Sequence, residues 1–191
     1  MTTLLRTLAV GVTLAALLPG CTDQPAPLDP GGAPSLKRAK GPKHPEHVLV
    51  LQRLQPLPHD ITKSKWIDRG GGTIEIKEAG LKIDFKDGAL SEPTLITVTA
   101  LAGSDVAYEF GPHGTVFGGE VRIEQRLDKT TARDGGVPLE AGYFKQEEYH
   151  ARAGGAVLVH EVIPVALDGS RKEAEFTVEH FSGYLLASGR Q

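Results

Sequence analysis

The stretch L-I-T-V-T-A-L, residues 95–101, indicates the fold of this 191-residue chain. Successive side chains of a β-strand point to opposite faces, so the apolar residues at alternate positions should face a core while the threonines between them face outward. The same period of two recurs in T-I-E-I-K at residues 73–77 and in L-K-I-D-F at residues 81–85. Each of these segments therefore predicts a short, half-buried strand.

Similar segments continue along the chain, separated by glycine-containing turns such as Gly70-Gly71-Gly72. They predict further strands at residues 48–55, 65–68, 106–110, 120–126, 142–149, 157–163, 174–181 and 184–188. Roughly ten short strands at this spacing predict an all-β antiparallel sandwich. Lys129–Gly142 is the longest expected loop and a candidate contact for a partner.

The first residues have the pattern of an export signal. Arg6 precedes an uncharged apolar run over residues 7–18, which is shorter than the stretch of about 18 residues needed to span a bilayer. The run ends in L-P-G-C, which resembles a bacterial lipobox, and Cys21 is the only cysteine of the chain. This resemblance implies that residues 1–20 are a lipoprotein signal peptide and that acyl chains on Cys21 anchor the protein to a membrane. The alternative is a plain secretory signal with an incidental cysteine.

Residues 21–47 are rich in proline and lack apolar periodicity, so they predict a disordered tether behind the lipidated cysteine. Thr22 follows Cys21 where an aspartate would favour the inner membrane, so the outer membrane is the expected location. Residues 48–191 suffice for one domain with its own core. That domain has 16 basic and 21 acidic residues, which gives no electrostatic footprint for nucleic acid.

Four motifs occur in the order found in a known family: G-G-T-I at residues 71–74, D-G-A-L at 87–90, Y-E-F-G-P-H-G-T-V-F at 108–117 and H-F-S-G-Y at 180–184. Residues 64–188 thereby resemble the ZU-five domain, the β-sandwich of ankyrins, zonula occludens protein and netrin receptors, which also occurs in bacterial surface proteins. The resemblance implies a sandwich that works through protein interactions. Lys86-Asp87 depart from the family, which often has paired prolines there.

The tripeptide His180-Phe181-Ser182 has two interpretations. Some eukaryotic relatives are cut within it, which implies that the Ser182 hydroxyl would attack the Phe181 carbonyl with His180 as the base. The alternation of residues 174–181 instead favours a last strand, with Phe176, Val178 and His180 on one face and Thr177, Glu179 and Phe181 on the other. In that strand a backbone carbonyl would satisfy the His180 ring, and Ser182-Gly183 would form a bulge or kink.

Other candidate sites are less specific. The G-P-H-G segment at 111–114 predicts a corner with His113 exposed and Phe110 and Phe117 packed beneath it, and Gly88 and Gly111 suit positive φ or close packing. Seven histidines lack metal-site spacing, so neither a metal nor a cofactor is expected. Glu147-Glu148 with Glu109 or Glu124 could form a glycosidase pair or simply a solvated strand face. Tyr143, Phe144 and Tyr149 could form a sugar-stacking surface or pack in the core and across strands.

The expected function is that of an exported, lipid-anchored cell-envelope protein. Its sandwich is expected to be a non-catalytic protein-interaction or structural module, with the membrane bound through Cys21 and an envelope protein or glycan as partner. The alternatives are a self-cleaving domain cut between Phe181 and Ser182 and a glycan-binding envelope module.

Overall fold

A computed structural model of the chain describes residues 45–133, 136, 138–152, 155–170 and 172–190. The expected signal peptide, the lipidation site at Cys21 and the tether up to residue 44 lie outside the described residues. Within the described residues, no helix combines the length and the apolar character needed to cross a membrane.

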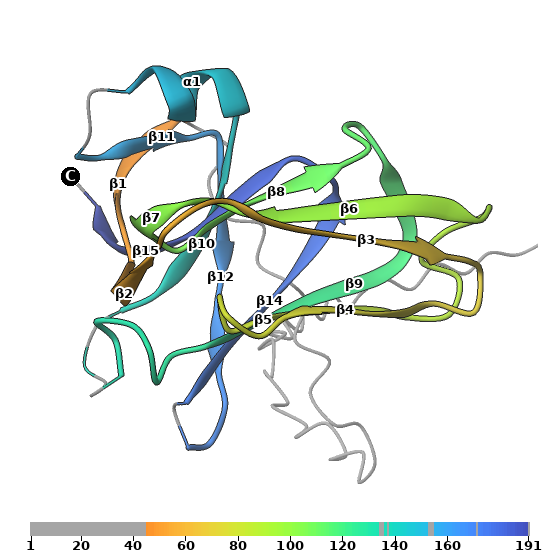
Figure 1. The fold of residues 1–191 in the computed structure, drawn as a ribbon, viewed down its shortest axis with the longest axis horizontal. Helices are drawn as coiled ribbons and strands as arrows, with labels where there is room; N and C mark the ends of the chain where they lie inside the picture. The colour runs from red at the N-terminus through yellow and green to blue at the C-terminus, as the bar shows by residue number, and fades with distance from the viewer. Residues whose placement is uncertain (1–44, 134–135, 137, 153–154, 171, 191) are drawn as a thin grey trace, which may run out of the picture. The chain divides into compact units, whose positions relative to one another are not determined.

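The predicted all-β sandwich is confirmed, because the described residues form fifteen strands and one short helix (Figure 1). The expected strands 48–55 and 157–163 are each split in two, which accounts for part of the higher number. The elements are β1 (Glu46–Val50), β2 (Gln52–Leu57), β3 (Ile61–Ile67), β4 (Gly72–Ile76), β5 (Leu81–Phe85), β6 (Thr94–Ala100), β7 (Gly103–Asp105), β8 (Ala107–Gly111), β9 (Val116–Arg126), β10 (Glu140–Phe144), α1 (Gln146–Ala151), β11 (Val157–Val159), β12 (Glu161–Pro164), β13 (Ala166–Leu167), β14 (Glu173–His180) and β15 (Gly183–Arg190).

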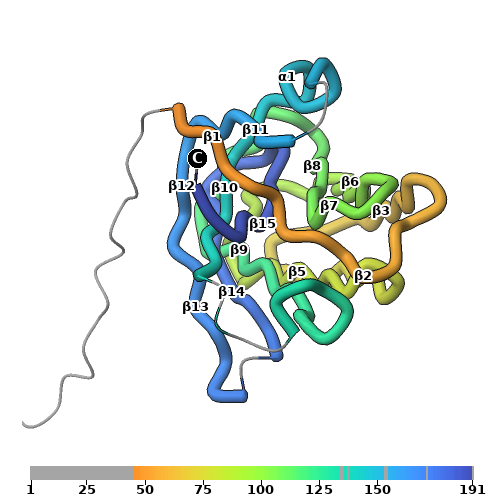
Figure 2. The backbone as a smooth tube through the Cα atoms, turned by 90° about the vertical axis from the view of Figure 1, so that its left-hand side faces the viewer, coloured from red at the N-terminus to blue at the C-terminus, as the bar shows by residue number. Residues whose placement is uncertain are grey.

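The strands form two main antiparallel sheets. An eight-stranded sheet has the order β11-β1-β15-β8-β6-β3, with β10 paired to β15 and β12 paired to β10. A five-stranded sheet has the order β13-β14-β9-β5-β4, and β3 and β6 run above β4 and β5 in Figure 1. A small third sheet pairs β2 with β7. Figure 2 shows β2 passing beside the segment that follows β9, and the Leu54 amide donates to the Lys129 carbonyl there at 2.8 Å.

The core follows the predicted alternation. Ile96, Val98 and Ala100 of β6 are fully buried, whereas the threonines between them are only partly covered. The main core contains six large aromatic side chains among the described residues, namely Phe85, Tyr108, Phe110, Phe176, Phe181 and Tyr184. A second cluster lies around Phe144, Tyr149 and the apolar residues of β1 and β11.

Three expected strands are wrong in part, and one of them, residues 48–55, is divided at Leu51 between β1 and β2. Residues 142–149 do not form one strand, because β10 ends at Phe144 and α1 begins at Gln146. Glutamates in the first helical turn are favoured by the helix dipole, and the short helix brings Tyr149 back onto the ring of Phe144, with centroids 4.6 Å apart. The expected strand 157–163 is broken at His160, where pairing changes from β1 to β10.

The expected loop Lys129–Gly142 is also corrected. Thr130 and Ala132 are buried, and the Thr131 amide donates to the Gln52 carbonyl at 2.9 Å, so the start of this segment is fastened to β2. Its last three residues belong to β10. Deleting the whole segment would remove core residues, so such a deletion cannot test a loop contact.

Candidate functional site

The tripeptide His180-Phe181-Ser182 connects β14 to β15, and Phe181 lies in the core. The pairing of β14 with β9 contains an irregularity between Val178 and His180, which changes the face on which the following side chain lies. Phe181 is only 2% exposed. The prediction that Phe181 shares the face of Thr177 and Glu179 is therefore wrong, because a strict period of two does not continue through the bulge.

The Phe181 ring is held by aromatic neighbours. It stacks on Phe110 at a centroid distance of 5.3 Å and meets Phe117 and Phe85 edge-on at 4.7 and 6.0 Å. The Phe181 amide donates to the Thr115 carbonyl at 2.9 Å. The predicted packing of Phe110 and Phe117 beneath the corner is thus confirmed, since both rings converge on Phe181.

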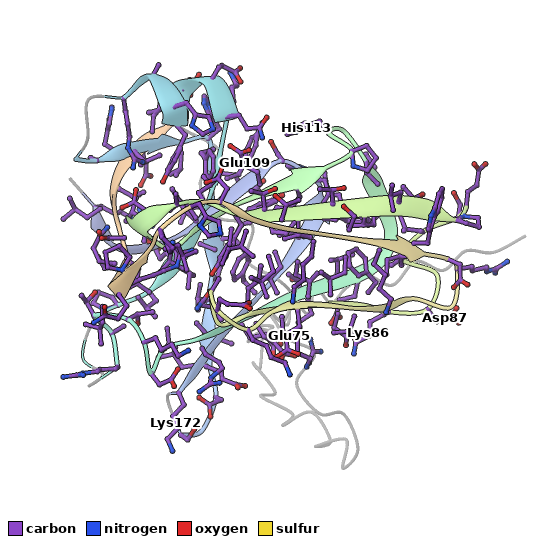
Figure 3. The ribbon with its side chains drawn as sticks, viewed as in Figure 1. Glu75, Lys86, Asp87, Glu109, His113 and Lys172 are labelled. Atoms are coloured by element: carbon purple, nitrogen blue, oxygen red, sulfur yellow. The ribbon has the colours of Figure 1, made fainter. Side chains whose placement is uncertain are left out.

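The corner itself carries His113, which is exposed as predicted and lies beyond the end of β8 in Figure 3. The Gly114 amide donates to the Phe181 carbonyl at 3.4 Å, so the carbonyl that self-cleavage would attack is part of this corner. Gly88 has the predicted positive φ of 76°. Gly111 does not, because it lies in β8, and a Cβ atom there would meet Thr97 only at an ordinary 3.9 Å.

The imidazole of His180 has side-chain neighbours from three strands. Its Nδ1 lies 3.3 Å from the Tyr184 hydroxyl, its Nε2 lies 3.8 Å from the Glu161 carboxylate, and its ring meets Tyr143 edge-on at 5.2 Å. The predicted backbone-carbonyl partner of the ring is therefore wrong. No hydrogen bond joins this ring to the Ser182 hydroxyl among the described residues.

The hydroxyl of Tyr184 donates to the His180 carbonyl at 2.8 Å, and burial raises the pKa of Tyr184 far above its ordinary range. Position 183 requires glycine because the ring of Phe144 leaves no room there for a side chain. A Cβ atom at Gly183 would lie within 3.0 Å of three ring atoms of Phe144. The motif thus supplies a core aromatic, a ring-packed glycine and a hydrogen-bonded carbonyl to the fold.

Three of the four carboxylates considered for a glycosidase pair are bound to separate basic partners. Glu124 lies on the five-stranded sheet and pairs with Lys82 at 2.8 Å. Glu109 lies on the other sheet, on the side of α1 (Figure 3), and contacts His150 at 2.7 Å. Glu148 contacts His160 at 2.6 Å. Within the described part of the chain, no three His, Cys, Asp or Glu residues are placed to hold a metal ion.

The aromatic residues near α1 pack internally. Phe144 and Tyr149 are buried and stacked, so they cannot form a sugar-stacking surface. Tyr143 is partly buried, with His160 and Tyr184 each at 6.0 Å. The packing alternative is therefore the one that the structure supports for these three residues.

Sequence reasoning missed a buried arginine. Arg53 of β2 is 6% exposed, and its Nη1 donates to the carbonyls of Leu101 at 3.2 Å, of Gly103 at 3.4 Å and of Asp105. Its Nε and Nη2 are shielded from solvent, and neither makes a hydrogen bond of ordinary geometry to a described residue, although the guanidinium interacts with the Tyr108 hydroxyl. The guanidinium carbon lies 5.5 Å from the centre of the Tyr108 ring. The sequence contains one signal of this burial: Arg53 comes two positions after Leu51, so a period of two places it on the same inward face.

Arg53 lines a cavity of about 370 Å³ together with residues of β2, the β4–β5 turn and the segment after β9. Other buried polar groups lie in the same region. The Gln125 side chain donates to the Ala79 carbonyl at 3.0 Å and accepts from the Tyr108 hydroxyl. Burial raises the pKa of Tyr108, although the Arg53 guanidinium opposes this shift.

The Asp105 carboxylate is already fully engaged. It accepts from Gln52 at 2.7 Å, from the Tyr149 hydroxyl at 2.8 Å and from Arg152. Burial raises the pKa of Asp105, but these three hydrogen bonds together hold it below the ordinary 3.8. This carboxylate therefore links β2, β7 and α1, and only its backbone carbonyl serves Arg53.

An exposed face lies on the outer side of β3 and β6. Trp66 is 66% exposed and lies opposite Leu95, which is 44% exposed. Two rows of hydroxyls continue this face: Ser64 with Thr97 at 2.8 Å, and Thr62 with Thr99 at 2.9 Å. We call these six residues the β3–β6 face.

No family model matches the chain, and no curated protein sequence matches it either.

Proposed function

We propose that the chain is a non-catalytic binding module of the cell envelope, anchored through a lipidated Cys21, that contacts its partner through the β3–β6 face. The observation that carries this proposal is the exposure of Trp66 beside Leu95. Tryptophan is enriched among the residues that dominate binding energy at interfaces, and contiguous exposed apolar side chains mark interaction sites.

The edge of β3 supports a contact through side chains rather than through strand addition. Lys63 and Lys65 reach across to the Glu75 and Thr73 carbonyls of β4, at 2.7 and 3.1 Å. Lysines on an edge strand hinder pairing with another chain. The outer face, with its apolar pair and hydroxyl rows, is the better docking surface.

The chain has one tryptophan, so its fluorescence reports directly on this face. We expect soluble peptidoglycan fragments or detergent-extracted envelope proteins that bind the full chain to shift the Trp66 emission and to protect it from acrylamide. Trp66→Ala should abolish co-purification of the partner, whereas Val116→Ala, at a 75% exposed position on β9, should not. A partner that binds with unchanged Trp66 emission and quenching would refute this location. Binding of the envelope proteins would indicate a protein partner, whereas binding of the peptidoglycan fragments would indicate the alternative, a glycan.

The remaining alternative, self-cleavage between Phe181 and Ser182, has a direct test. Our proposal predicts a single species with the full C-terminus in intact-mass spectrometry. Loss of residues 182–191 that Ser182→Ala prevents would establish self-cleavage instead.

The anchor is tested separately. A clickable palmitate analogue should label the wild-type protein but not Cys21→Ala. Equal labelling of both proteins would refute lipidation at Cys21 and leave the β3–β6 face proposal unaffected.

A further inference from the structure

The β3–β6 face carries hydroxyl groups and no charge. Four of its six side chains are serine or threonine, and the other two are Trp66 and Leu95. The lysines of β3 alternate with these residues and donate instead to carbonyl groups of β4. Glu109 borders the face opposite Thr99, and its carboxylate contacts His150 at 2.7 Å. A charged ligand would lose hydration at this face without gaining an ion pair, so the face complements an uncharged partner.

The hydroxyl groups of the face retain hydrogen-bonding capacity toward solvent. In each of the pairs Ser64–Thr97 and Thr62–Thr99, one hydroxyl donates to the other, so one O–H group per pair remains free to donate. These four hydroxyls make no further hydrogen bond to the described residues. Hydroxyl hydrogens rotate to suit their partner, so the two rows can donate to or accept from a ligand that presents both kinds of group. A polyhydroxylated ligand meets this requirement along its whole length.

The face forms a strip that runs along β3 and β6, which lie side by side in Figure 1. Its three rows, each a cross-strand pair, follow one another two residues apart. At about 3.4 Å per residue, the strip is about 14 Å long from Trp66 to Thr62. Gly111 of β8 is opposite Thr97, so no side chain rises beside the middle row. The strip is long enough for more than one sugar ring of an extended chain, and a single ring would cover only part of it.

We propose that the β3–β6 face binds an uncharged glycan chain, with one sugar ring stacked on Trp66 and the next sugars hydrogen-bonded to the hydroxyl rows. Trp66 is 66% exposed, so its ring is accessible to the C–H face of a sugar, which gains dispersion and weak C–H···π attraction there. Leucine, serine and threonine are under-represented among the residues that dominate protein–protein binding, and they are five of the six residues here. A glycan therefore fits this face better than a protein. The inference rests on the proposed function, because it names the ligand class of the same face.

Titration of the full-length protein with chitohexaose and cellohexaose, two uncharged β-linked hexamers, tests the proposal. At least one hexamer should shift the Trp66 emission saturably, and its disaccharide should bind more weakly because it covers fewer rows. A hexamer of galacturonic acid, which carries a carboxylate on each sugar, should bind more weakly than the uncharged hexamer. Absence of binding by both uncharged hexamers, or equally tight binding of the charged one, would overturn the inference. Envelope proteins that still changed the Trp66 emission would then leave the proposed function standing with a protein partner, whereas no change with either class of ligand would refute the proposed function as well.

Variants locate the glycan on the strip, with calorimetry as the measurement. Trp66→Ala should weaken binding at least about tenfold, as for a tryptophan that dominates an interface, and Trp66→Phe should weaken it less because a smaller ring remains. Thr97→Val removes one hydroxyl at nearly constant shape and should weaken binding about two- to tenfold, as expected for one hydrogen bond. Thr177→Val, at another half-buried threonine on the outer side of the five-stranded sheet, should leave the affinity unchanged. Wild-type affinity in Trp66→Ala, or equal losses in Thr97→Val and Thr177→Val, would place the glycan elsewhere and overturn the proposal.

Discussion

Replacing Phe181 with alanine should lower the free energy of unfolding by about 3–5 kcal/mol, the usual cost of removing a buried phenylalanine. The upper half of that range applies here, because Phe181 is almost fully buried and its ring contacts Phe85, Phe110 and Phe117. Such aromatic pairs contribute about 0.5–1.5 kcal/mol each beyond the buried area. For a domain of this size, about 4 kcal/mol corresponds to a fall in melting temperature of roughly 8–16 °C.

The assay is urea unfolding of the full-length protein followed by far-ultraviolet circular dichroism. Trp66 is exposed in the folded state, so its fluorescence is a poor probe of unfolding. Val116→Ala, near Phe117 but exposed, should change the free energy by less than about 0.5 kcal/mol. Ser182→Ala should also remain within about 0.5 kcal/mol of wild type. A change below about 1 kcal/mol for Phe181→Ala would refute the burial of this tripeptide in the core.

Two further predictions concern other parts of the domain. Gly183→Ala should destabilise the protein by about 1–3 kcal/mol through the clash with Phe144, whereas Gly189→Ala in the same strand, whose nearest neighbour lies at 4.0 Å, should cost little in the same assay. The pKa of Asp168 is lowered from 3.8 to about 2, first by its hydrogen bond from the Ser170 hydroxyl and then by backbone amides. Its ionised form therefore stabilises the fold above about pH 4, and this contribution is lost as the pH falls through about 2. In Asp168→Asn, the midpoint of urea unfolding should therefore depend less on pH between pH 2 and 5 than it does in the wild type. The same pH dependence in both proteins would contradict this prediction.

The strands with strict alternation were predictable from the sequence. Leu81–Phe85 matches the expected strand at both ends, because three inward apolar residues alternate with two charged ones. The helix α1 was not predicted, since six residues are too few to show a helical period and Tyr149 fits a strand pattern equally well. Its formation depends on Phe144, a contact that only the tertiary fold creates.

The burial of Arg53 could not be predicted from the sequence pattern for a related reason. A charged residue in an alternating segment is ordinarily assigned to the solvent face. Arg53 instead faces inward, because its Nη1 is hydrogen-bonded to the carbonyls of the turn before β7 and of β7 itself. Those carbonyls lie about fifty residues away in sequence, so the residues around Arg53 do not predict these hydrogen bonds.

The fold gives a structural reason for three of the four residues in the H-F-S-G segment at 180–183. Phe181 is required by the core, Gly183 by the ring of Phe144, and His180 by its contacts with Glu161 and Tyr184. The hydroxyl of Ser182 makes no side-chain hydrogen bond within the described part of the chain, so the fold does not account for a serine at that position. The thermodynamic effect of Ser182→Ala is therefore expected to be small, and any large effect of that substitution must come from chemistry or from a partner.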